Sequence, residues 1–256
     1  WTIGQFVWTG FDYLGEPTPY DVDAWPSHSS YFGIFDLASL PKDRFWLYRS
    51  QWNRERPTLH LLPHWTWPGR EGEKTPVMCY TSYPMAELFV NGVSQGVRRF
   101  EEAAAPNSGE TGAANSAATM LRYRLIWPDV VYEPGKIEVV AYDSDGREAS
   151  RDSRVTAASP DHIVLESNRR VLEADGLDLA YVTVSIVDSS GNLCPTATNR
   201  VDFSVEGDGF FRACANGDAT CLEPFQKPSM PAFSGQLTAI VQSLPHRGTI
   251  TLRASS

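Results

Sequence analysis

Apolar and polar residues alternate along most of the chain from about residue 57 onward. The clearest run lies within residues 180–188, where valine and isoleucine alternate with tyrosine, threonine and serine from Tyr181 to Val187. β-Branched residues with a two-residue period are typical of strands that bury one face. This pattern predicts a mainly β protein.

Short strands separated by turn residues recur through residues 57–156. Asn91-Gly92 follows the apolar run of residues 87–90, and this dipeptide strongly favours a two-residue hairpin turn. Residues 103–118 are small and polar and predict a long loop. The strands predicted in this region cover residues 58–67, 77–83, 87–90, 97–100, 119–127 and 136–142. So many short strands in about a hundred residues indicate an antiparallel, immunoglobulin-like β-sandwich.

Residues 159–256 repeat this pattern with a different sequence, after a linker at residues 153–160. Ser189 to Asn192 supply a turn between two apolar runs. The predicted strands cover residues 162–167, 180–188, 200–205, 236–242 and 248–254. A second immunoglobulin-like β-sandwich is the simplest interpretation.

Residues 1–56 are aromatic and irregular by comparison. The apolar run of residues 6–11 predicts a buried strand, and residues 31–36 predict a second short extended piece. Pro41 is suited to the first helical position, and aromatic residues recur at helical spacing up to Trp52. The pattern predicts a strand, a loop and a helix over residues 41–53, which together cannot enclose a core.

Composition and charge narrow the classes of partner. The 256 residues carry a net charge of −9, so the chain lacks the broad basic surface that binds nucleic acid. No apolar run approaches the roughly 20 residues that cross a bilayer. The four cysteines, Cys79, Cys194, Cys214 and Cys221, form no zinc-binding pattern. Cys214 and Cys221 are close enough in sequence to be bridged, which spacing alone leaves open.

The first region also contains the most suggestive side chains. Trp8 lies at the end of the predicted strand, and Asp12, Tyr13 and Glu16 follow in a glycine-containing loop. Glycosidases use paired carboxylates and hold the sugar ring against an aromatic face. The alternative from spacing alone is that Trp8 belongs to a core and that the carboxylates are solvated.

A family resemblance changes this balance. Residues 4–20, GQFVWTGFDYLGEPTPY, resemble the eighth barrel strand and following loop of family 2 glycoside hydrolases, and are most similar to β-galactosidases of Bacteroides-type bacteria. Further similar segments cover nearly the whole chain: WP at 25–26, SSYFGIFD at 29–36, PKDR at 41–44, LYRSQW at 47–52, LLPHW at 61–65, ELFVNG at 87–92, ADG at 174–176, LAYVTV at 179–184 and NGD at 216–218.

The resemblance implies a fold and an incomplete active site. Residues 1–56 would be the last strand-loop-helix unit of a (β/α)8 barrel, followed by sandwiches at 57–156 and 159–256. In this family both catalytic glutamates lie on earlier barrel strands, and the acid/base follows an asparagine; the chain contains no Asn-Glu dipeptide. Beginning at Trp1 within an apolar run, the chain is interpreted as a fragment of a retaining β-galactosidase. We therefore expect no catalytic residue and no activity in the isolated chain.

The resemblance also assigns roles outside catalysis. Trp8 matches a sugar-stacking tryptophan, and Asp12 and Glu16 match motif positions that could contact a β-galactoside or brace the loop. Phe32 stands where some relatives carry a sodium-binding asparagine, so no metal or other cofactor is expected. The resemblance further implies a periplasmic or secreted protein and allows a homo-oligomer.

A second hypothesis is a non-catalytic module that binds carbohydrate or protein, because the last sandwich also resembles invasin-like immunoglobulin domains. Exposed aromatic residues on one sheet face would favour that role. His60, His64, Trp65 and Trp67 could line such a face, but sandwich core and rim is the more common role. Asp208, Asn216 and Asp218 lack the compact spacing of a calcium site.

Overall fold

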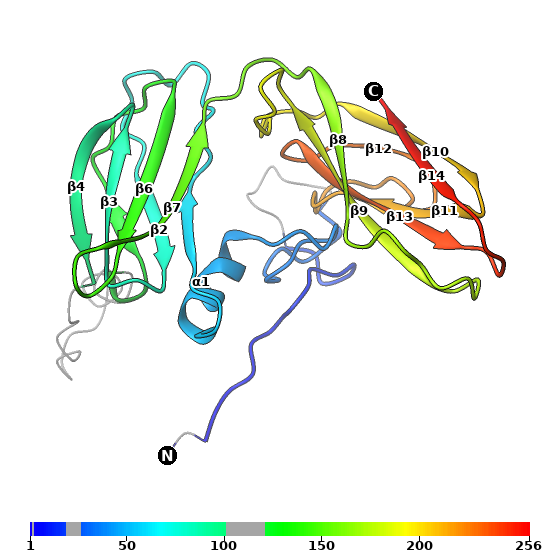
Figure 1. Ribbon diagram of the computed structural model, residues 1–256, viewed down its shortest axis with the longest axis horizontal. Helices are drawn as coiled ribbons and strands as arrows, with labels where there is room; N and C mark the ends of the chain where they lie inside the picture. The colour runs from blue at the N-terminus through cyan, green and yellow to red at the C-terminus, as the bar shows by residue number, and fades with distance from the viewer. Residues whose placement is uncertain (2, 19–26, 101–120) are drawn as a thin grey trace. The chain divides into compact units, whose positions relative to one another are not determined.

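The computed structural model describes residues 1, 3–18, 27–100 and 121–256, and the fold is mainly β (Figure 1). The chain divides into two compact units. One consists of Asp43–Thr156, and the other combines Trp1–Lys42 with Ala157–Ser256. The predicted loop at residues 103–118 and the first residues of the strand predicted at 119–127 lie outside the described residues.

In its described residues, the first unit is a sandwich of seven strands with helix α1 packed on its side. Its sheets have the orders β1-β2-β5 and β4-β3-β6-β7. Asn91 and Gly92 have φ angles of 49° and 82° and form the tight turn between β3 and β4. The elements are α1 (Asp43–Trp52), β1 (Leu59–Leu62), β2 (Val77–Thr81), β3 (Met85–Val90), β4 (Val93–Arg99), β5 (Leu125–Trp127), β6 (Lys136–Tyr142) and β7 (Glu148–Val155).

Both sheets of this unit contribute to one apolar core. Alternate residues of β3 and β6 point inward, and the cluster includes the fully buried rings of Trp65, Trp127 and Tyr132. Trp65 donates its indole N–H to the Glu133 carbonyl at 2.9 Å, so burial leaves that donor satisfied. Trp67 stacks on His64 with ring centroids 4.0 Å apart. Trp65 therefore belongs to the core, and the half-buried Trp67 packs against it beside His64.

The last hundred residues form a second seven-stranded sandwich. Its sheets have the orders β12-β10-β14 and β11-β13-β9-β8, and residues from both sheets share a core around Val184, Val201 and Leu237. The strands are β8 (His162–Ser167), β9 (Leu179–Val187), β10 (Arg200–Gly207), β11 (Gly209–Ala215), β12 (Ser229–Pro231), β13 (Gln236–Ser243) and β14 (Ile250–Ser255). Three sulfur atoms, those of Cys79, Cys194 and Cys214, are buried, and all four cysteines are free thiols.

The N-terminal segment is less regular than its sequence predicts. Residues 6–11 form no strand; Phe11 makes a single parallel bridge to Phe35. The amides of Ile34 and Phe35 donate to the carbonyls of Thr9 and Gly10 at 3.1 and 2.8 Å. A strand needs a neighbour along its length, and these residues have one only at their C-terminal end. Their assignment to the last unit of a barrel remains a prediction.

The helix begins later than its sequence pattern indicates. Pro41 forms a bridge with Phe35, and the helix starts at Asp43, whose carboxylate lies in the first turn. The ring of Trp46 stacks on His60 at 4.8 Å, and this contact joins the helix to β1. The helix therefore belongs to the first sandwich unit rather than to the segment that precedes it.

Candidate functional site

The candidate site is the loop of residues 8–16, where an exposed aromatic side chain is held by a tyrosine and a carboxylate. Trp8 is 72% exposed, and its indole N–H donates to the Tyr13 hydroxyl at 3.3 Å. The Tyr13 hydroxyl in turn donates to the Glu16 carboxylate, and this hydrogen bond raises the Tyr13 pKa. The Tyr13 ring meets the Trp8 ring edge-on at 6.2 Å. The hydrogen bonds from Trp8 to Tyr13 and from Tyr13 to Glu16 thus orient the Trp8 indole while its ring stays exposed to solvent.

The backbone of this loop is shaped by two consecutive residues with positive φ. Gly15 has φ 88° and Glu16 has φ 47°. The left-handed conformation suits glycine and is uncommon for a residue with a side chain. At Glu16 it accompanies the hydrogen bond to Tyr13, which lies three residues earlier. The turn returns the carboxylate toward the tyrosine and so completes the contact with Trp8.

Asp12 lies within the protein, and its carboxylate contacts two separate segments. Its carboxylate accepts hydrogen bonds from the Gly33 amide at 2.7 Å and from the Lys42 ammonium at 2.6 Å. Its side chain is only 4% exposed, whereas that of Lys42 is 28% exposed. Lys42 also donates to the Tyr31 carbonyl at 2.6 Å. These contacts support the bracing role considered for Asp12, and its role as a sugar contact remains a prediction.

Gly33 allows the chain to pass close to Asp12. A Cβ added there would lie 2.3 Å from the Asp12 backbone nitrogen. That distance is far below van der Waals contact, so any larger residue would push the two segments apart. The aromatic side chain of the preceding Phe32 meets the Tyr13 ring edge-on at 5.9 Å. Phe32 therefore takes part in apolar packing beneath the loop.

A second carboxylate, the half-buried Asp36, links the segment to the last sandwich. Its carboxylate accepts the Leu40 amide at 2.8 Å, and a Cβ added at Gly217 would lie 2.2 Å from its other oxygen. Burial raises the Asp36 pKa to about 6. The hydroxyl of Thr238 on β13 donates to the Ala38 carbonyl at 2.8 Å. The turn at residues 36–40 therefore rests on the outer face of the sheet.

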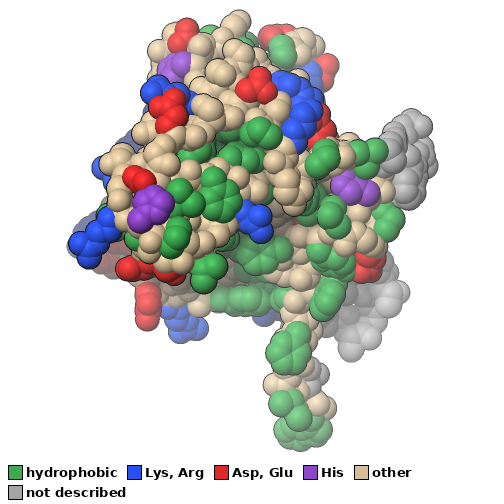
Figure 2. Space-filling view, turned by 90° about the vertical axis from the view of Figure 1, so that its right-hand side faces the viewer, with side chains coloured by type: hydrophobic (Ala, Val, Ile, Leu, Met, Phe, Trp, Pro, Cys, Tyr) green, Lys and Arg blue, Asp and Glu red, His purple; other side chains and the backbone are tan. Residues whose placement is uncertain are grey.

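The apolar side chains before Trp8 have few neighbours. Trp1, Ile3 and Phe6 are fully exposed to solvent, and Phe11 is 53% exposed. Figure 2 shows hydrophobic side chains along the tail that projects from the surface. Contiguous apolar surface of this kind is typical of an interface. These exposed apolar side chains are therefore available for contact with another protein surface.

The described residues give no indication of a metal centre. Among residues 1, 3–18, 27–100 and 121–256, no three histidine, cysteine, aspartate or glutamate residues are close enough to share an ion. Asp218 instead accepts the Thr220 amide and hydroxyl at 2.8 and 2.7 Å. Asp208 pairs with His246 at 2.9 Å. In the same part of the chain, no helix is long and apolar enough to span a membrane.

Comparison with known proteins assigns the chain to a family. Residues 163–256 match the glycoside hydrolase family 2 C-terminal domain 5, and residues 72–150 match a domain of unknown function. The chain is 41% identical over 254 residues to the β-galactosidase BoGH2A of Bacteroides ovatus, covering 99% of this chain and 27% of that protein. The chain is a C-terminal part of the family 2 glycoside hydrolases. It thus spans about a quarter of this curated relative.

Other relatives support the family and its fold. A putative β-glucuronidase of Formosa agariphila is 31% identical over 249 residues, which cover 96% of this chain and 22% of that protein. The crystal structure of a β-glycosidase from Bacteroides vulgatus matches 96% of this chain and 28% of its own, with 35% identity and a TM-score of 0.80. A family 2 member from Bacteroides cellulosilyticus matches all of this chain and 34% of its own, with 28% identity and a TM-score of 0.81. The predicted family and the mainly β fold are confirmed.

The sequence singled out Trp8, Asp12 and Glu16, and the structure brings Trp8 and Glu16 together through Tyr13. It places Asp12 on the inner side of the same loop. Lys42, Gly33 and Asp36 were not singled out. Asp12 and Lys42 are 30 residues apart in the chain, and no local pattern announces such a contact. Gly33 and Asp36 stand in a segment that the family resemblance covers, and this was the only signal for them.

Proposed function

We propose that this chain is the accessory, C-terminal part of a retaining β-galactoside hydrolase. In this proposal Trp8 contributes one wall of the sugar pocket, Glu16 offers a polar contact beside it, and the two sandwiches support the catalytic barrel. The observation that carries the proposal is an indole that is 72% exposed yet fixed by Tyr13 and Glu16. A fixed ring face can stack on a sugar at little entropic cost.

The reaction belongs to the whole protein and requires residues that this chain does not carry. Retaining hydrolysis uses two carboxyl groups about 5 Å apart, one as nucleophile and one as acid/base. Asp12 is engaged by Lys42 and Gly33, and Glu16 by Tyr13, so neither stands as a free member of such a pair. The resemblance places both glutamates on earlier strands of the barrel. We therefore propose that the isolated chain is inactive.

Galactosides are the proposed substrate class, with glucuronides as the second candidate. Support for galactosides comes from the 41% identity to the Bacteroides ovatus β-galactosidase, against 31% to the putative β-glucuronidase of Formosa agariphila. Chromogenic β-galactoside and β-glucuronide, offered to the full-length protein, would separate the two. The resemblance further suggests a periplasmic or secreted protein, which fractionation of the source cells would test.

Exchange of Trp8 tests the proposed sugar contact. In the full-length protein, Trp8→Ala should lower kcat/KM for the β-galactoside roughly tenfold or more, because a stacking surface is lost. The control is Trp52→Ala, since Trp52 is similarly exposed, at 65%, but lies in the other compact unit. Equal kcat/KM values for Trp8→Ala and the unaltered protein would remove Trp8 from the site.

The alternative of a glycan-binding module finds less support. Exposed aromatic rings are few on the described residues of the two sandwiches, with Tyr181 and Phe210 as the large ones. A binding face usually gathers several such rings. The described surface therefore favours a supporting role.

A further inference from the structure

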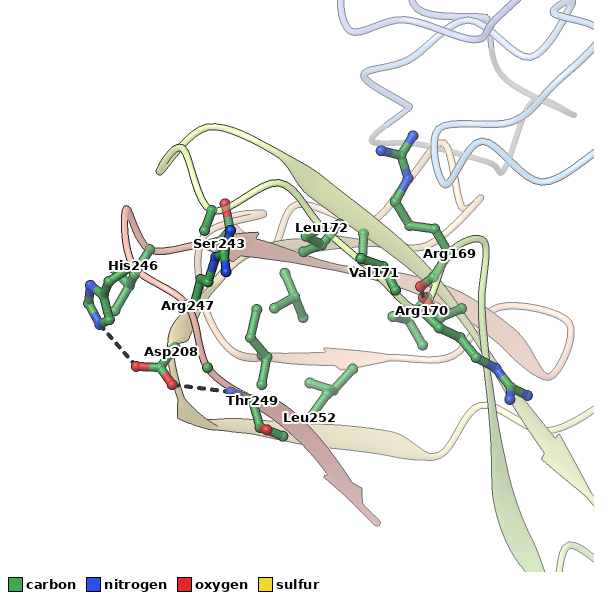
Figure 3. A pocket seen from close by; sticks show the side chains of 18 of the residues that line it. Arg169, Arg170, Val171, Leu172, Asp208, Ser243, His246, Arg247, Thr249 and Leu252 are labelled. Carbon is green, nitrogen blue, oxygen red and sulfur yellow. Dashed lines mark hydrogen bonds and ion pairs between the residues drawn. The ribbon is translucent and has the colours of Figure 1, made fainter.

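The last sandwich contains a cavity between the edges of its two sheets. Its volume is about 570 Å³, and Leu165 of β8 and Ile250 and Leu252 of β14 line its sides. Val182 and Val241, from β9 and β13, form part of its floor, and both are buried. Figure 3 shows Leu252 and Val171 on opposite sides of this space. This cavity is partly open to solvent, and it separates side chains that would otherwise pack closely.

The cavity lies where both sheets end. β8 is the last strand of its four-stranded sheet, and β14 is the last strand of the three-stranded sheet. Ile250, Leu252 and Ala254 alternate with more exposed residues along β14, yet each remains only half-buried. Residues with this alternation become buried when a further strand covers them. The outer edge of β14 also presents backbone groups to which such a strand can bind.

The rim of the cavity is basic, although the whole chain is acidic. In Figure 3, Arg169 and Arg170 lie at one end, and His246 and Arg247 lie at the other. Asp178 pairs with Arg169 at 3.0 Å, and Asp208 pairs with His246 at 2.9 Å. Within the part of the chain that the structure describes, Arg170 and Arg247 have no acidic partner. An occupant with acidic residues at its ends would complement this rim.

The lining also argues against a sugar. Aliphatic side chains dominate it, and among the described residues no phenylalanine, tyrosine or tryptophan lines the cavity. An extended chain with an aliphatic residue at every second position can pack against this lining. Its backbone N–H and C=O groups can also form hydrogen bonds with the edge of β14. Both requirements are met by an extended peptide.

We propose that an extended segment from the remainder of the same polypeptide inserts between β8 and β14 as an additional strand. The segment carries aliphatic residues at alternate positions and acidic residues at its ends. The curated relatives extend well beyond the matched region, which is 27% of the Bacteroides ovatus protein. A tethered segment binds at a high effective concentration, which favours this source over a separate partner. The proposal is independent of the sugar chemistry of Trp8.

Peptide binding to the 256-residue chain tests this proposal. The probe is a fluorescein-labelled peptide, ETVTVTVTE, whose valines can enter the cavity, and fluorescence anisotropy measures its affinity. We expect ETSTSTSTE, which lacks the aliphatic groups, to bind at least about tenfold more weakly. KTVTVTVTK should also bind more weakly, because its ends meet the arginines.

Two protein variants locate the binding site. Leu165→Asp puts a charge on the cavity wall and should weaken binding of ETVTVTVTE at least about tenfold. Leu165 is 37% exposed, so this variant should remain folded, which its urea unfolding curve checks. Glu166→Gln alters the neighbouring side chain, which points away from the cavity, and should leave the affinity within about twofold.

The full-length protein identifies the source of the strand. If a segment of the full-length protein fills the cavity, ETVTVTVTE should bind this chain but not the full-length protein. Equal binding to both would overturn the proposal, as would a failure of the valine peptide to bind or equal affinity for the serine peptide. A dimer of this chain that dissociates when the peptide is added would assign the cavity to a second copy instead.

Discussion

At the residue scale, Asp12 determines the path of the segment that carries Trp8. Its buried carboxylate accepts hydrogen bonds from the Gly33 amide at 2.7 Å and from the Lys42 ammonium at 2.6 Å. Removing one partner of such a pair leaves a charge without compensation, which is costly in a poorly solvated site. The geometry of Trp8 should therefore depend on Lys42, 34 positions further along the chain.

Replacement of Lys42 tests this dependence. Lys42→Met should lower the free energy of local opening by about 2 kcal/mol, which corresponds to roughly 30-fold faster amide exchange. Hydrogen exchange by mass spectrometry on peptides covering residues 10–16 and 29–36 measures it. The control is Arg253→Gln, because both partners of the Arg253–Glu206 pair are more than 60% exposed and such pairs contribute little. Unchanged exchange in Lys42→Met would mean that Asp12 does not brace the loop.

Asp36 gives the protein a defined pH dependence. Burial raises its pKa to about 6 from an ordinary value of 3.8, so the folded state binds the proton more tightly than the unfolded state. Its contribution to stability is complete below pH 4 and is lost as the pH rises through about 6. Asp36→Asn, which carries no charge, should therefore be more stable than the unaltered chain at pH 7, by up to about 3 kcal/mol.

Urea unfolding at pH 4 and pH 7 measures this effect. The stability difference between Asp36→Asn and the unaltered chain should increase from the lower pH to the higher one. Asp202→Asn, at an exposed position on β10, should show no such increase. A difference for Asp36→Asn that stays constant between the two pH values would contradict the assigned cause.

At the scale of elements, the N-terminal segment and the sandwiches differ in how their residues are held. Both sandwiches have cores with fully buried side chains, whereas Trp1, Ile3 and Phe6 lie in solvent. Among the described residues of this segment, backbone hydrogen bonds begin at Thr9 and Gly10, whose carbonyls accept the amides of Ile34 and Phe35. The residues before Thr9 therefore lack the contacts that protect a backbone from proteolysis.

Limited proteolysis should show this difference. Chymotrypsin should cut first after Phe6 or Trp8, while peptide bonds in the strands of both sandwiches survive. Intact-mass spectrometry identifies the first product. Protection of these sites, or earlier cleavage within a sandwich strand, would show that residues 1–10 pack more tightly than the structure indicates.

How much of the fold the sequence predicts depends on how regular each pattern is. The predicted strands at residues 136–142 and 162–167 match β6 and β8, because both sequences have clear apolar runs. β7, β11 and β12 were not predicted. β7 reads EASRDSRV and has no apolar period, since it is an edge strand in which no residue is fully buried. β12 has only three residues, too few to show a period.

The candidate site was predictable only in part for a related reason. Trp8 and Glu16 belong to a continuous run that carries the family resemblance. The hydrogen bonds of Asp12 to Gly33 and Lys42 join residues 21 and 30 positions apart. Such contacts depend on tertiary packing, and sequence spacing does not reveal them. The open cavity between β8 and β14 likewise follows from strand order.

For the whole molecule, we propose that sugar contact and catalysis depend on different parts of the polypeptide. We propose that this chain supplies an oriented sugar-contact residue and two supporting sandwiches, and that the catalytic carboxylates lie in the remainder of the protein. The chain covers about a quarter of the length of its curated relative. Loss of both carboxylates reduces the rate of a glycosidase by many orders of magnitude.

Hydrolysis of a chromogenic β-galactoside by this chain and by the full-length protein, at equal molar concentration, tests that claim most directly. The account predicts turnover by the full-length protein and a rate at the buffer background for this chain. Turnover by this chain, abolished by Glu16→Gln, would contradict it and would make the carboxylates of the Trp8 loop catalytic.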